Sequence, residues 1–432
     1  MGLNMLLEFS VANFRSIGEE QTLYMQPAFK SKDEDHNILE TGIRREPQAL
    51  PVVAILGANA SGKSNILKAL DTLRQIISIS ANRTKNDNYS DYSFKLNPDY
   101  SQKPTIFKIK FLSFGKIYTY HIEITPEAIT KENLTVVSSA KGSRIKTLIK
   151  REGQKTEFHK SIYHKKSFLD LWSADLNKQQ TALAYLSNKG EVDTLESVVE
   201  WFSITGLISP DARAHLVTAN TIMRQNEKKD PILKYLQNAD FNICDIKITK
   251  GNTAKEDLTE KQRELLQVTN GRFHPDLKTH FAHTDTEGKI IYLSLEKDES
   301  NGTKTYFALA SLILSALQIG ATMWIDELDL SLHPYLIRRI IQLFTNKETN
   351  PKGAQLIFTT HDVTVMDKSL LRPDEIYFTE KDKETFETKL YSLSEFKGMG
   401  SVSKNDRGEK LYKDYLNGRF GAVPDVDWEG GI

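Results

Sequence analysis

The chain has 432 residues, of which 39% are hydrophobic and 26% charged, as is typical of a globular protein. Its 57 basic and 57 acidic residues cancel, which argues against obligate nucleic-acid binding over the whole surface but leaves a local basic patch open. The single cysteine, Cys244, excludes an intrachain disulfide and a cysteine-based metal site. It favours a cytoplasmic location, and no signal peptide is visible before Arg15.

The first part of the chain predicts two strand hairpins with a strand–loop–helix unit between them. Apolar residues alternate in the hairpin strands, and the buried strand before the loop is apolar throughout. The expected elements are strands at 6–14 and 21–25, a buried strand at 51–56, a helix at 64–80, and strands at 105–113 and 116–125.

The middle of the chain has weaker patterns, and we interpret residues 131–284 as a compact, mainly helical insertion. Helices are expected at 163–177, 194–202, 230–239 and 255–268, and strands at 243–248 and 289–295. None of the helices sustains apolar heptads over several repeats, so a long coiled-coil arm is not expected.

One segment, Thr305 to Ile325, is uncharged throughout and meets the length criterion for a membrane span. Gly320 divides it, and two carboxylates, Asp326 and Glu327, follow at once. We therefore expect a buried helix that leads into a central strand, because fully buried elements are also apolar on all sides.

The most specific motif lies between the predicted strand at 51–56 and the helix that follows it. The sequence GANASGKS fits G-x-x-x-x-G-K-[S/T] without a mismatch, in the strand–loop–helix context that this pattern requires. Glycines let the backbone wrap around phosphate, the lysine charge meets the terminal phosphates, and the final hydroxyl binds Mg²⁺. The predicted nucleotide-binding residues are Gly57, Ala58, Asn59, Ala60, Ser61, Gly62, Lys63, Ser64 and Asn65.

A second apolar strand, Thr322 to Ile325, ends in two carboxylates. Asp326 is the expected partner of Ser64 at Mg²⁺, directly or through water. Glu327 is the candidate general base for the attacking water. Strands that end in acidic surface residues are common, so this pattern indicates a nucleotide site only in combination with the phosphate-binding loop.

The order of the remaining motifs resembles the ATPase heads of the ABC class, within its SMC/RecN/OLD-like branch. In these proteins a signature loop precedes the Walker B strand, a D-loop follows it, and a switch histidine ends the next strand. The resemblance implies that His361 contacts the γ-phosphate and that Ser300, Asn301, Gly302 and Asp329 act in trans, from a second copy. The signature departs from the usual LSGGQ, since only a serine and a glycine remain.

Further motifs resemble the stand-alone ATP-binding family of bacterial abortive-infection and anti-phage operons, including the AbiL type and the ATPase subunit of PARIS. They are NFRSI at 13–17, GANASGKSN, ESNGT, IDELDLSLHP, QLIFTTHD and GRFGAVP at 418–424. The resemblance implies an ATPase, converting ATP and water to ADP and phosphate, that senses a phage trigger or controls a partner effector. That partner is commonly a TOPRIM-like nuclease. Arg15 would then lie near the nucleotide.

The expected fold is therefore α/β, a P-loop NTPase of the ABC-ATPase type. It would have a mixed central sheet, N-terminal antiparallel strands and the helical insertion. The expected domains are an N-terminal half of the head at 1–130, the insertion at 131–284 and a C-terminal half at 285–432. The expected partners are Mg²⁺ with ATP, a second copy of the chain in a homodimer or larger even-numbered oligomer, and an effector protein, with no membrane.

Three alternatives stay open. A GTPase would need Asn-Lys-x-Asp, whereas residues 188–191 are Asn-Lys-Gly-Glu. An OLD-like ATPase with its own nuclease would need a further domain, and Asp425-Val-Asp427 is the only D-x-D in the C-terminal tail. A DNA-repair head of the SMC/RecN type would bind nucleic acid in a salt-dependent way. His274, His280 and His283 match no common metal-ligand spacing.

Overall fold

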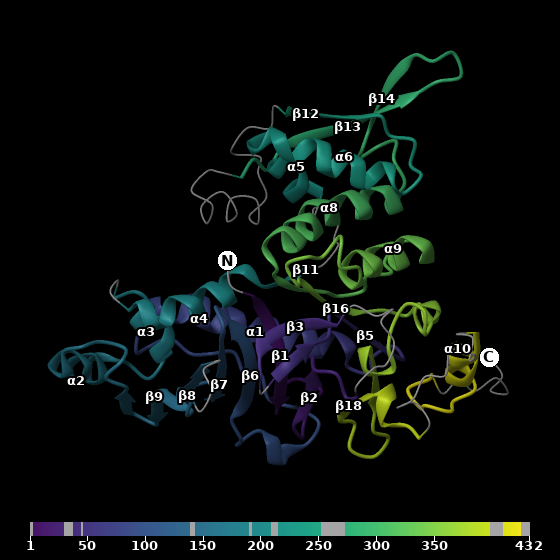
Figure 1. Cartoon of the computed structure of the whole chain (residues 1–432). Coiled ribbons are helices and arrows are strands. Elements are labelled where there is room, and N and C mark those ends of the chain that lie inside the picture. Colours follow the sequence, from purple (N-terminus) through teal and green to yellow (C-terminus); the bar gives the residue numbers. More distant parts are fainter. Residues whose placement is uncertain are drawn as a thin grey trace. The chain divides into compact units, whose positions relative to one another are not determined.

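The computed structural model describes residues 3–29, 38–44, 46–138, 143–189, 192–208, 215–251, 273–397 and 409–424 (Figure 1). The chain forms two compact units. Unit 1 comprises Met1–Ile208, Ile319–Asp326 and Arg338–Ile432, and unit 2 comprises Ser209–Gln318 and Glu327–Ile337. Each unit is described here by itself.

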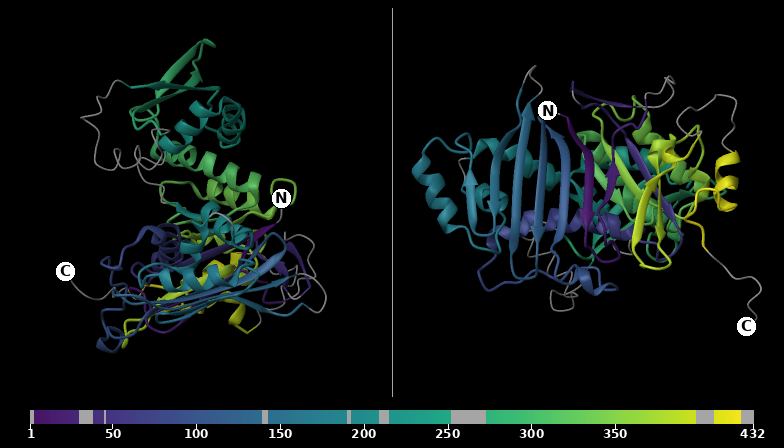
Figure 2. Two further views of the ribbon diagram at one scale, coloured as in Figure 1. Left: turned by 90° about the vertical axis from the view of Figure 1, so that its left-hand side faces the viewer. Right: turned by 90° about the horizontal axis from the view of Figure 1, so that it is seen from below.

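Unit 1 contains a seven-stranded antiparallel sheet in the order β10-β9-β8-β7-β6-β1-β2. The right-hand view of Figure 2 shows its strands side by side. Its strands are β1 (Asn4–Ala12), β2 (Gln21–Tyr24), β6 (Thr105–Ser113), β7 (Lys116–Ile124), β8 (Ile129–Ser138), β9 (Lys146–Glu152) and β10 (Lys155–Phe158). Both expected hairpins are present, since β1 pairs with β2 and β6 with β7.

A second, six-stranded sheet of unit 1 has the order β11-β15-β16-β5-β17-β18. Its first five strands are parallel to their neighbours and β18 is antiparallel. Its strands are β5 (Val52–Gly57), β11 (Gly206–Ile208), β15 (Thr322–Ile325), β16 (Gln355–Thr359), β17 (Ile376–Lys381) and β18 (Thr388–Ser392). A short ribbon of β3 (Leu39–Ile43) and β4 (Glu46–Ala49) completes the strands described in this unit.

One hydrophobic core joins both sheets of unit 1 to its helices. It contains Phe9 of β1, Phe107 of β6, Ile55 of β5, Leu67 of α1 and Trp201 of α4, each at most 1% exposed. Burial of this apolar area is the main force that holds the sheets on either side of α1. The helices of unit 1 are α1 (Lys63–Ile79), α2 (Lys166–Asp175), α3 (Ala182–Ser187), α4 (Asp193–Ile204), α9 (Pro334–Thr345) and α10 (Glu409–Leu416); the start of α9 lies in unit 2.

Unit 2 combines helices with a three-stranded antiparallel sheet, β12-β13-β14. Its elements are α5 (His215–Arg224), α6 (Lys229–Gln237), β12 (Asp245–Lys250), β13 (Leu277–Thr284), β14 (Ile290–Ser294) and α8 (Asn301–Ile319), which ends at the border with unit 1. Most of α8 is buried, as expected for the uncharged segment. Among the described residues no helix is long and apolar enough to cross a membrane.

The predicted α/β fold class is confirmed, with a mixed central sheet and N-terminal antiparallel strands. The region 131–284 differs from the expected single helical insertion, because it holds strands as well as helices and is split between the units. Strands β8 to β10 extend the antiparallel sheet, and α3 and α4 enter its core. Unit 2 begins only at Ser209. The helix expected at 255–268 lies outside the described residues.

Candidate functional site

The GANASGKS loop connects β5 to α1, and its two flanking glycines have positive φ angles, 151° at Gly57 and 109° at Gly62. A Cβ at Gly57 would lie 2.4 Å from the Thr379 carbonyl oxygen, and one at Gly62 would lie 2.1 Å from Thr388 Oγ1. Only glycine avoids both the strained backbone and the clash. Strands β17 and β18 therefore pack directly against the loop and restrict its backbone conformation.

Lys63 begins α1, and its side chain folds back over the loop. Its Nζ donates hydrogen bonds to the carbonyl oxygens of Gly57 (2.8 Å) and Ala58 (2.9 Å), and the residue is only 6% exposed. The N-cap, Gly62, provides no side-chain hydrogen bond, and the first turn contains no acidic residue. No side chain therefore caps or neutralises this end of α1, and its positive dipole end favours an anion.

The predicted magnesium ligands lie together at the ends of α1 and β15. Ser64 Oγ donates a hydrogen bond to Asp326 Oδ1 at 2.8 Å, and Thr359 Oγ1 at the end of β16 donates to the same oxygen at 2.7 Å. Hydroxyl and carboxylate oxygens are the hard ligands that Mg²⁺ takes alongside phosphate and water. The donor set therefore fits Mg²⁺. Among the described residues no cluster of three His, Cys, Asp or Glu side chains forms a separate metal site.

Hydrogen bonds of side-chain hydroxyl groups connect the loop to the segment after β1 and to strands β17 and β18. Thr388 Oγ1 donates to the Ser61 carbonyl oxygen at 2.9 Å and shares a 2.7 Å hydrogen bond with Ser16 Oγ. Asn65 Nδ2 donates to that same Ser16 oxygen at 2.7 Å, and Ser61 Oγ bonds Thr379 Oγ1 at 2.6 Å. The sequence motif 13–17 therefore supports the loop through Ser16.

Arg15, the residue of this motif that was expected at the nucleotide, has an exposed side chain. Its φ is 52°, its N–H donates to the Tyr92 carbonyl at 2.7 Å, and its guanidinium lies 5.7 Å from the Phe14 ring. These contacts hold its backbone against segment 91–105. Its contact with nucleotide stays a prediction.

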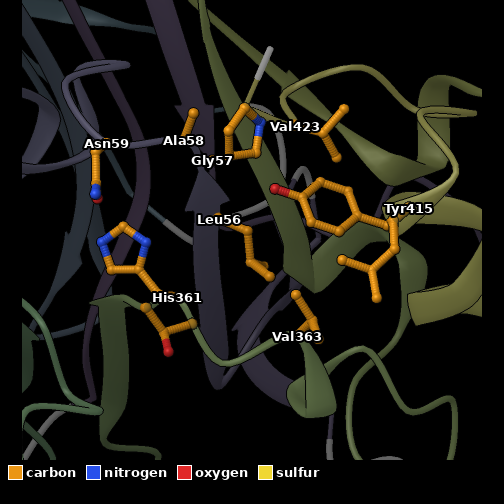
Figure 3. Close-up of a pocket in the computed structure, with 11 residues that line it drawn as sticks. Leu56, Gly57, Ala58, Asn59, His361, Val363, Tyr415 and Val423 are labelled. Carbon is orange, nitrogen blue, oxygen red and sulfur yellow. The ribbon is translucent and has the colours of Figure 1, made fainter. Parts of the chain in front are cut away.

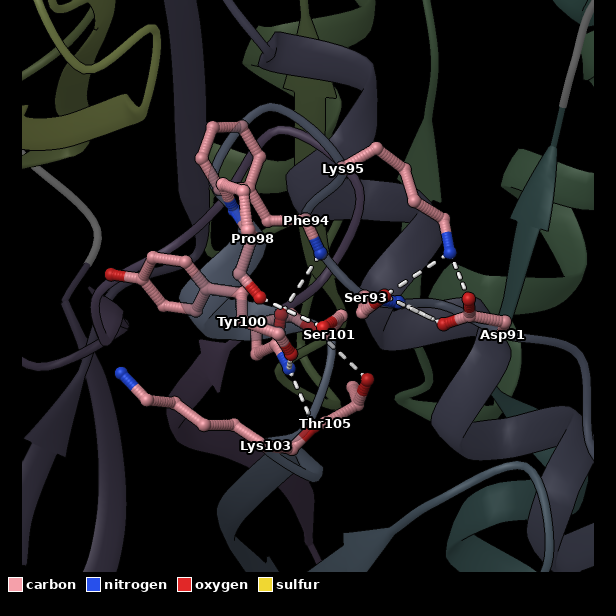
Figure 4. Close-up of polar contacts among 10 residues, drawn as sticks. Asp91, Ser93, Phe94, Lys95, Pro98, Tyr100, Ser101, Lys103 and Thr105 are labelled. Atoms are coloured by element: carbon pink, nitrogen blue, oxygen red, sulfur yellow. Dashed lines mark hydrogen bonds and ion pairs between the residues drawn. The ribbon is translucent and has the colours of Figure 1, made fainter.

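Polar contacts hold this neighbouring segment, whose residues Figure 4 labels from Asp91 to Thr105, and Asn13 makes several of them. Its Nδ2 donates to the carbonyls of Tyr100 (2.9 Å) and Lys103 (2.8 Å), and its Oδ1 accepts from the Phe94 N–H at 2.9 Å. The Asn13 side chain is 2% exposed, so these bonds satisfy a buried amide. Its role in the motif is structural.

His361 follows β16 and lines a pocket of about 460 Å³ (Figure 3). The pocket also contains the start of the loop, residues 57–59, and a C-terminal wall that includes Tyr415 and Val423. The switch histidine expected from sequence and the first residues of the phosphate-binding loop thus border one cavity within unit 1.

The residues predicted to act in trans lie in unit 2, where the segments predicted as signature loop and D-loop approach each other closely. Ser300 caps α8, since its Oγ accepts the Thr303 N–H at 3.1 Å. A Cβ at Gly302 would lie 2.9 Å from the Ser331 carbonyl oxygen, so glycine permits this close approach. Leu330, in the same turn as Asp329, is 46% exposed.

Two further features of unit 2 concern the predicted catalytic machinery. Glu327 has a φ of 54°, a conformation that only a specific turn makes a non-glycine residue adopt. His283 Nε2 lies 2.7 Å from Glu299 Oε1, and the two side chains are 20% and 10% exposed. This contact holds the residue just before Ser300. The roles of Glu327, Asn301 and Asp329 stay predictions.

The turn before β17 contains a buried acidic group. Glu375 Oε2 accepts the Arg372 N–H at 2.7 Å, and burial, together with the Asp374 charge, raises the Glu375 pKa to about 8. Arg372 also donates to Asp374 at 2.8 Å. The turn sets the start of the strand that carries Thr379.

A family model described as "AAA domain, putative AbiEii toxin, Type IV TA system" matches residues 52–367, well over half of the chain. The chain belongs to this family. The match begins at β5, the strand before the phosphate-binding loop, and ends beyond His361. It therefore includes the loop, Ser300, Asp326 and His361. No curated protein matches the sequence significantly.

Solved structures that resemble the chain include SMC head domains and RecF. The SMC head domain from Thermotoga maritima has 14% identity and a TM-score of 0.41, covering 90% of this chain and 98% of that one. An Smc head from Pyrococcus furiosus, with an extended coiled coil and bound to the C-terminal domain of ScpA, has 13% identity and a TM-score of 0.44, with 96% and 100% coverage. RecF with ATP has 17% identity and a TM-score of 0.35, with 90% and 98% coverage. At these levels the similarity carries no functional information.

Sequence patterns predicted the loop and named Ser64 and Asp326, which the structure brings together, but missed four residues that hold the loop and Asp326 in place. These are Ser16, Thr359, Thr379 and Thr388. Thr359 could have been predicted from the sequence, because it ends β16, the strand beside the predicted Walker B strand β15. Ser16 lies within the NFRSI motif but was not singled out there, and Thr379 and Thr388 carry no local signal.

Proposed function

We propose that the chain binds and hydrolyses ATP, with the GANASGKS loop as its phosphate site. Lys63 neutralises the terminal phosphates, and the amides at the start of α1 donate to them. Ser64 and Asp326 would hold Mg²⁺, which would supply stabilisation of the negative charge on the phosphates. Glu327 takes the proton of the attacking water, and His361 donates to the γ-phosphate.

The observation that carries this proposal is the 2.8 Å hydrogen bond between Ser64 and Asp326. Ser64 and Asp326 lie 262 positions apart in the sequence. Two separate sequence motifs predict them as ligands of the same Mg²⁺ ion. A chance P-loop pattern would not bring its final hydroxyl to the carboxylate that follows β15, a strand separated from β5 by β16 in the same sheet. Parallel sheets bind ligands at this carboxyl edge.

The proposal includes self-association through ATP. Ser300, Asn301 and Gly302 open α8, whose N-terminal amides would meet the γ-phosphate of a second copy, with Asp329 alongside. The exposed Leu330 belongs to the same surface. ATP then stabilises the closed dimer, and hydrolysis weakens it, because ATP and ADP differ in affinity for the two states.

We further propose that this cycle controls a partner protein in a defence operon. The resemblance of the motifs to abortive-infection ATPases supports this role, and so does the family's description, which names a toxin–antitoxin system. The partner would be an effector such as a TOPRIM-like nuclease, released or activated when a phage component is sensed. Co-expression with the neighbouring gene product, followed by affinity capture with ATP and with ADP, tests this part.

Complementation between inactive variants tests the ATPase and its shared sites. Lys63→Ala should lose nucleotide binding, and Ser300→Arg should bind ATP without turning it over. Mixed in equal amounts, the two variants should regain about a quarter of wild-type turnover, because half of the dimers contain one intact site. Full activity of Ser300→Arg alone would refute the shared site. Normal ATP binding by Lys63→Ala would refute the P-loop assignment.

A chemically inactive variant separates binding from hydrolysis. Glu327→Gln should bind ATP normally and accumulate as the closed dimer, since the base is missing but the phosphate contacts remain. Size-exclusion chromatography with ATP measures the dimer. Turnover equal to wild type in this variant would exclude Glu327 as the base. Mg²⁺-dependent cleavage of plasmid or tRNA by the chain alone would instead favour an OLD-like nuclease.

A further inference from the structure

The C-terminal segment 415–424 has an unusual backbone that fixes its path. After α10 ends at Leu416, three residues have positive φ angles: 77° at Gly418, 67° at Gly421 and 58° at Ala422. A Cβ at Gly421 would lie 2.7 Å from the Tyr391 hydroxyl, so this position needs glycine for space as well as for conformation. The GRFGAVP motif therefore encodes a specific pair of turns.

Aromatic contacts anchor these turns to the six-stranded sheet. Phe420 is 1% exposed and lies 6.1 Å from the ring of Phe378 on β17 and 5.2 Å from that of Phe396. The Tyr391 hydroxyl on β18 donates to the Phe420 carbonyl at 2.9 Å. Ring burial of this size dominates local packing energy, so the segment has a defined position on unit 1.

Tyr415 links α10 to the turns. Its ring stacks on Phe378 at 5.3 Å with an interplanar angle of 10°, and its hydroxyl donates to the Ala422 carbonyl at 2.9 Å. Burial raises the pKa of Tyr415 to about 12, so the phenol keeps its proton at neutral pH and remains a donor. The bond fixes the carbonyl just before Val423 and Pro424.

These contacts place Val423 and Pro424 on the wall of the pocket that also contains His361 and residues 57–59 (Figure 3). The remaining wall is largely apolar and includes Val363 and Leu416. At about 30 Å³ per water molecule, the 460 Å³ of the pocket holds roughly 15 waters. The pocket is thus large enough for a phosphate group and a limited amount of solvent.

Lys63 shows which end of a bound nucleotide would face this pocket. Its Nζ lies 2.8 Å and 2.9 Å from the carbonyl oxygens of Gly57 and Ala58, and both residues line the pocket. The lysine of this motif pairs with the β- and γ-phosphates. By this pairing, the pocket lies on the side of the terminal phosphates.

We propose that segment 415–424 is a wall of the nucleotide site that selects for a nucleoside triphosphate by shaping the space at the γ-phosphate. This inference rests on the proposed phosphate site and adds an element to it. Val423 and Pro424 do not bind the phosphate. Their apolar surfaces limit the water beside it and leave His361 and Asn59 as its polar neighbours.

A pocket-filling substitution tests the inference. Val423→Trp should reduce the space at the terminal phosphate, so ATP affinity should fall at least about tenfold while ADP affinity changes less than about twofold. Fluorescent ATP and ADP analogues measure both affinities. Arg419→Trp is the matched control, because it adds the same group to an exposed position of the same segment. It should leave both affinities unchanged.

Two results would overturn the inference. Equal losses of ATP and ADP affinity in Val423→Trp would mean that the substitution distorts the loop. Unchanged affinities would mean that the pocket does not receive the terminal phosphate. Binding is measured without turnover, so the result is independent of hydrolysis. Failure of the wild-type chain to bind either nucleotide would instead refute the proposed function.

A milder variant keeps the test valid if tryptophan disturbs folding. Tyr415→Phe removes the hydroxyl that bonds Ala422 but keeps the ring on Phe378. It should lower kcat severalfold with KM nearly unchanged, because the wall moves while the phosphate contacts remain. The same reduction in Tyr391→Phe would support a positioning role. A change confined to the melting temperature would mean that the segment only stabilises the fold.

Discussion

Asp326 offers a sharp test because its two hydrogen bonds share one oxygen. Ser64 and Thr359 both donate to Oδ1, at 2.8 Å and 2.7 Å. In Asp326→Asn the amide oxygen still accepts both bonds, whereas the negative charge and the second oxygen are lost. The free energy of unfolding of the ligand-free variant should therefore lie within about 1 kcal/mol of the wild-type value, which is the net contribution of one hydrogen bond.

The loss should appear when nucleotide and Mg²⁺ are added. ATP with Mg²⁺ at 100 times Kd stabilises the wild-type fold by about 2.7 kcal/mol. For 432 residues the entropy of unfolding is about 0.9 kcal/mol per degree, so the wild-type melting temperature should rise by about 3 °C. Asp326→Asn should show less than about one third of that rise, because its site lacks the carboxylate that holds the ion.

Thermal unfolding in ATP with EDTA, and in ATP with Mg²⁺, measures this difference for each variant. Asp71→Asn is the matched control, since Asp71 is a buried carboxylate on α1 that pairs with Arg74 at 2.8 Å. The control should keep the full Mg²⁺-dependent rise. An equal rise in Asp326→Asn would refute the assignment of Asp326 as a magnesium ligand, and a large fall in ligand-free stability would refute the hydrogen-bond argument.

Three further predictions concern residues around the site. Thr388→Ala should cost about 1–2 kcal/mol and weaken ATP binding severalfold, since it removes the hydroxyl that holds the Ser61 carbonyl; unchanged binding by calorimetry would contradict this. His283→Ala should lower turnover at low protein concentration, because Glu299 and the adjoining signature loop lose a contact; the same loss in His280→Ala would show a general effect of the strand. Glu375 has a pKa raised from 4.5 to about 8, so the folded state holds its proton more tightly. The contribution of Glu375 to the free energy of unfolding is therefore complete below pH 4.5, and it decreases by up to about 5 kcal/mol as the pH rises to 8. Glu375→Gln should flatten this dependence in melting curves, and an unaltered slope would contradict it.

Local patterns predicted the parts of the site that local physics determines. The strand before Gly57 and the helix after it follow from a short apolar run, two glycines and the helical period. Asp326 could be recognised because an apolar strand ended in carboxylates after a P-loop. Each of these features is complete within about ten residues of sequence.

The remaining contacts could not be predicted because their partners are far apart in the chain. Thr379 and Thr388 look like ordinary strand residues, and only the pairing of β17 with β5 brings Thr379 against Gly57. Strands β8 to β10 alternate weakly, so their addition to the N-terminal sheet depends on neighbours rather than on their own pattern. A mixed sequence of strands and helices therefore resembled a helical insertion.

The position of β5 between β16 and β17 also determines when the site is formed during synthesis. Ser61 and Thr388 are 327 residues apart, yet their hydrogen bond holds the phosphate-binding loop. Chains emerge from the ribosome N-terminus first, so β5 lacks both neighbouring strands until most of the protein has been made. A truncated or stalled chain would carry the GANASGKS sequence without a formed loop. Under the proposed function, only chains that have reached β18 would then respond to ATP.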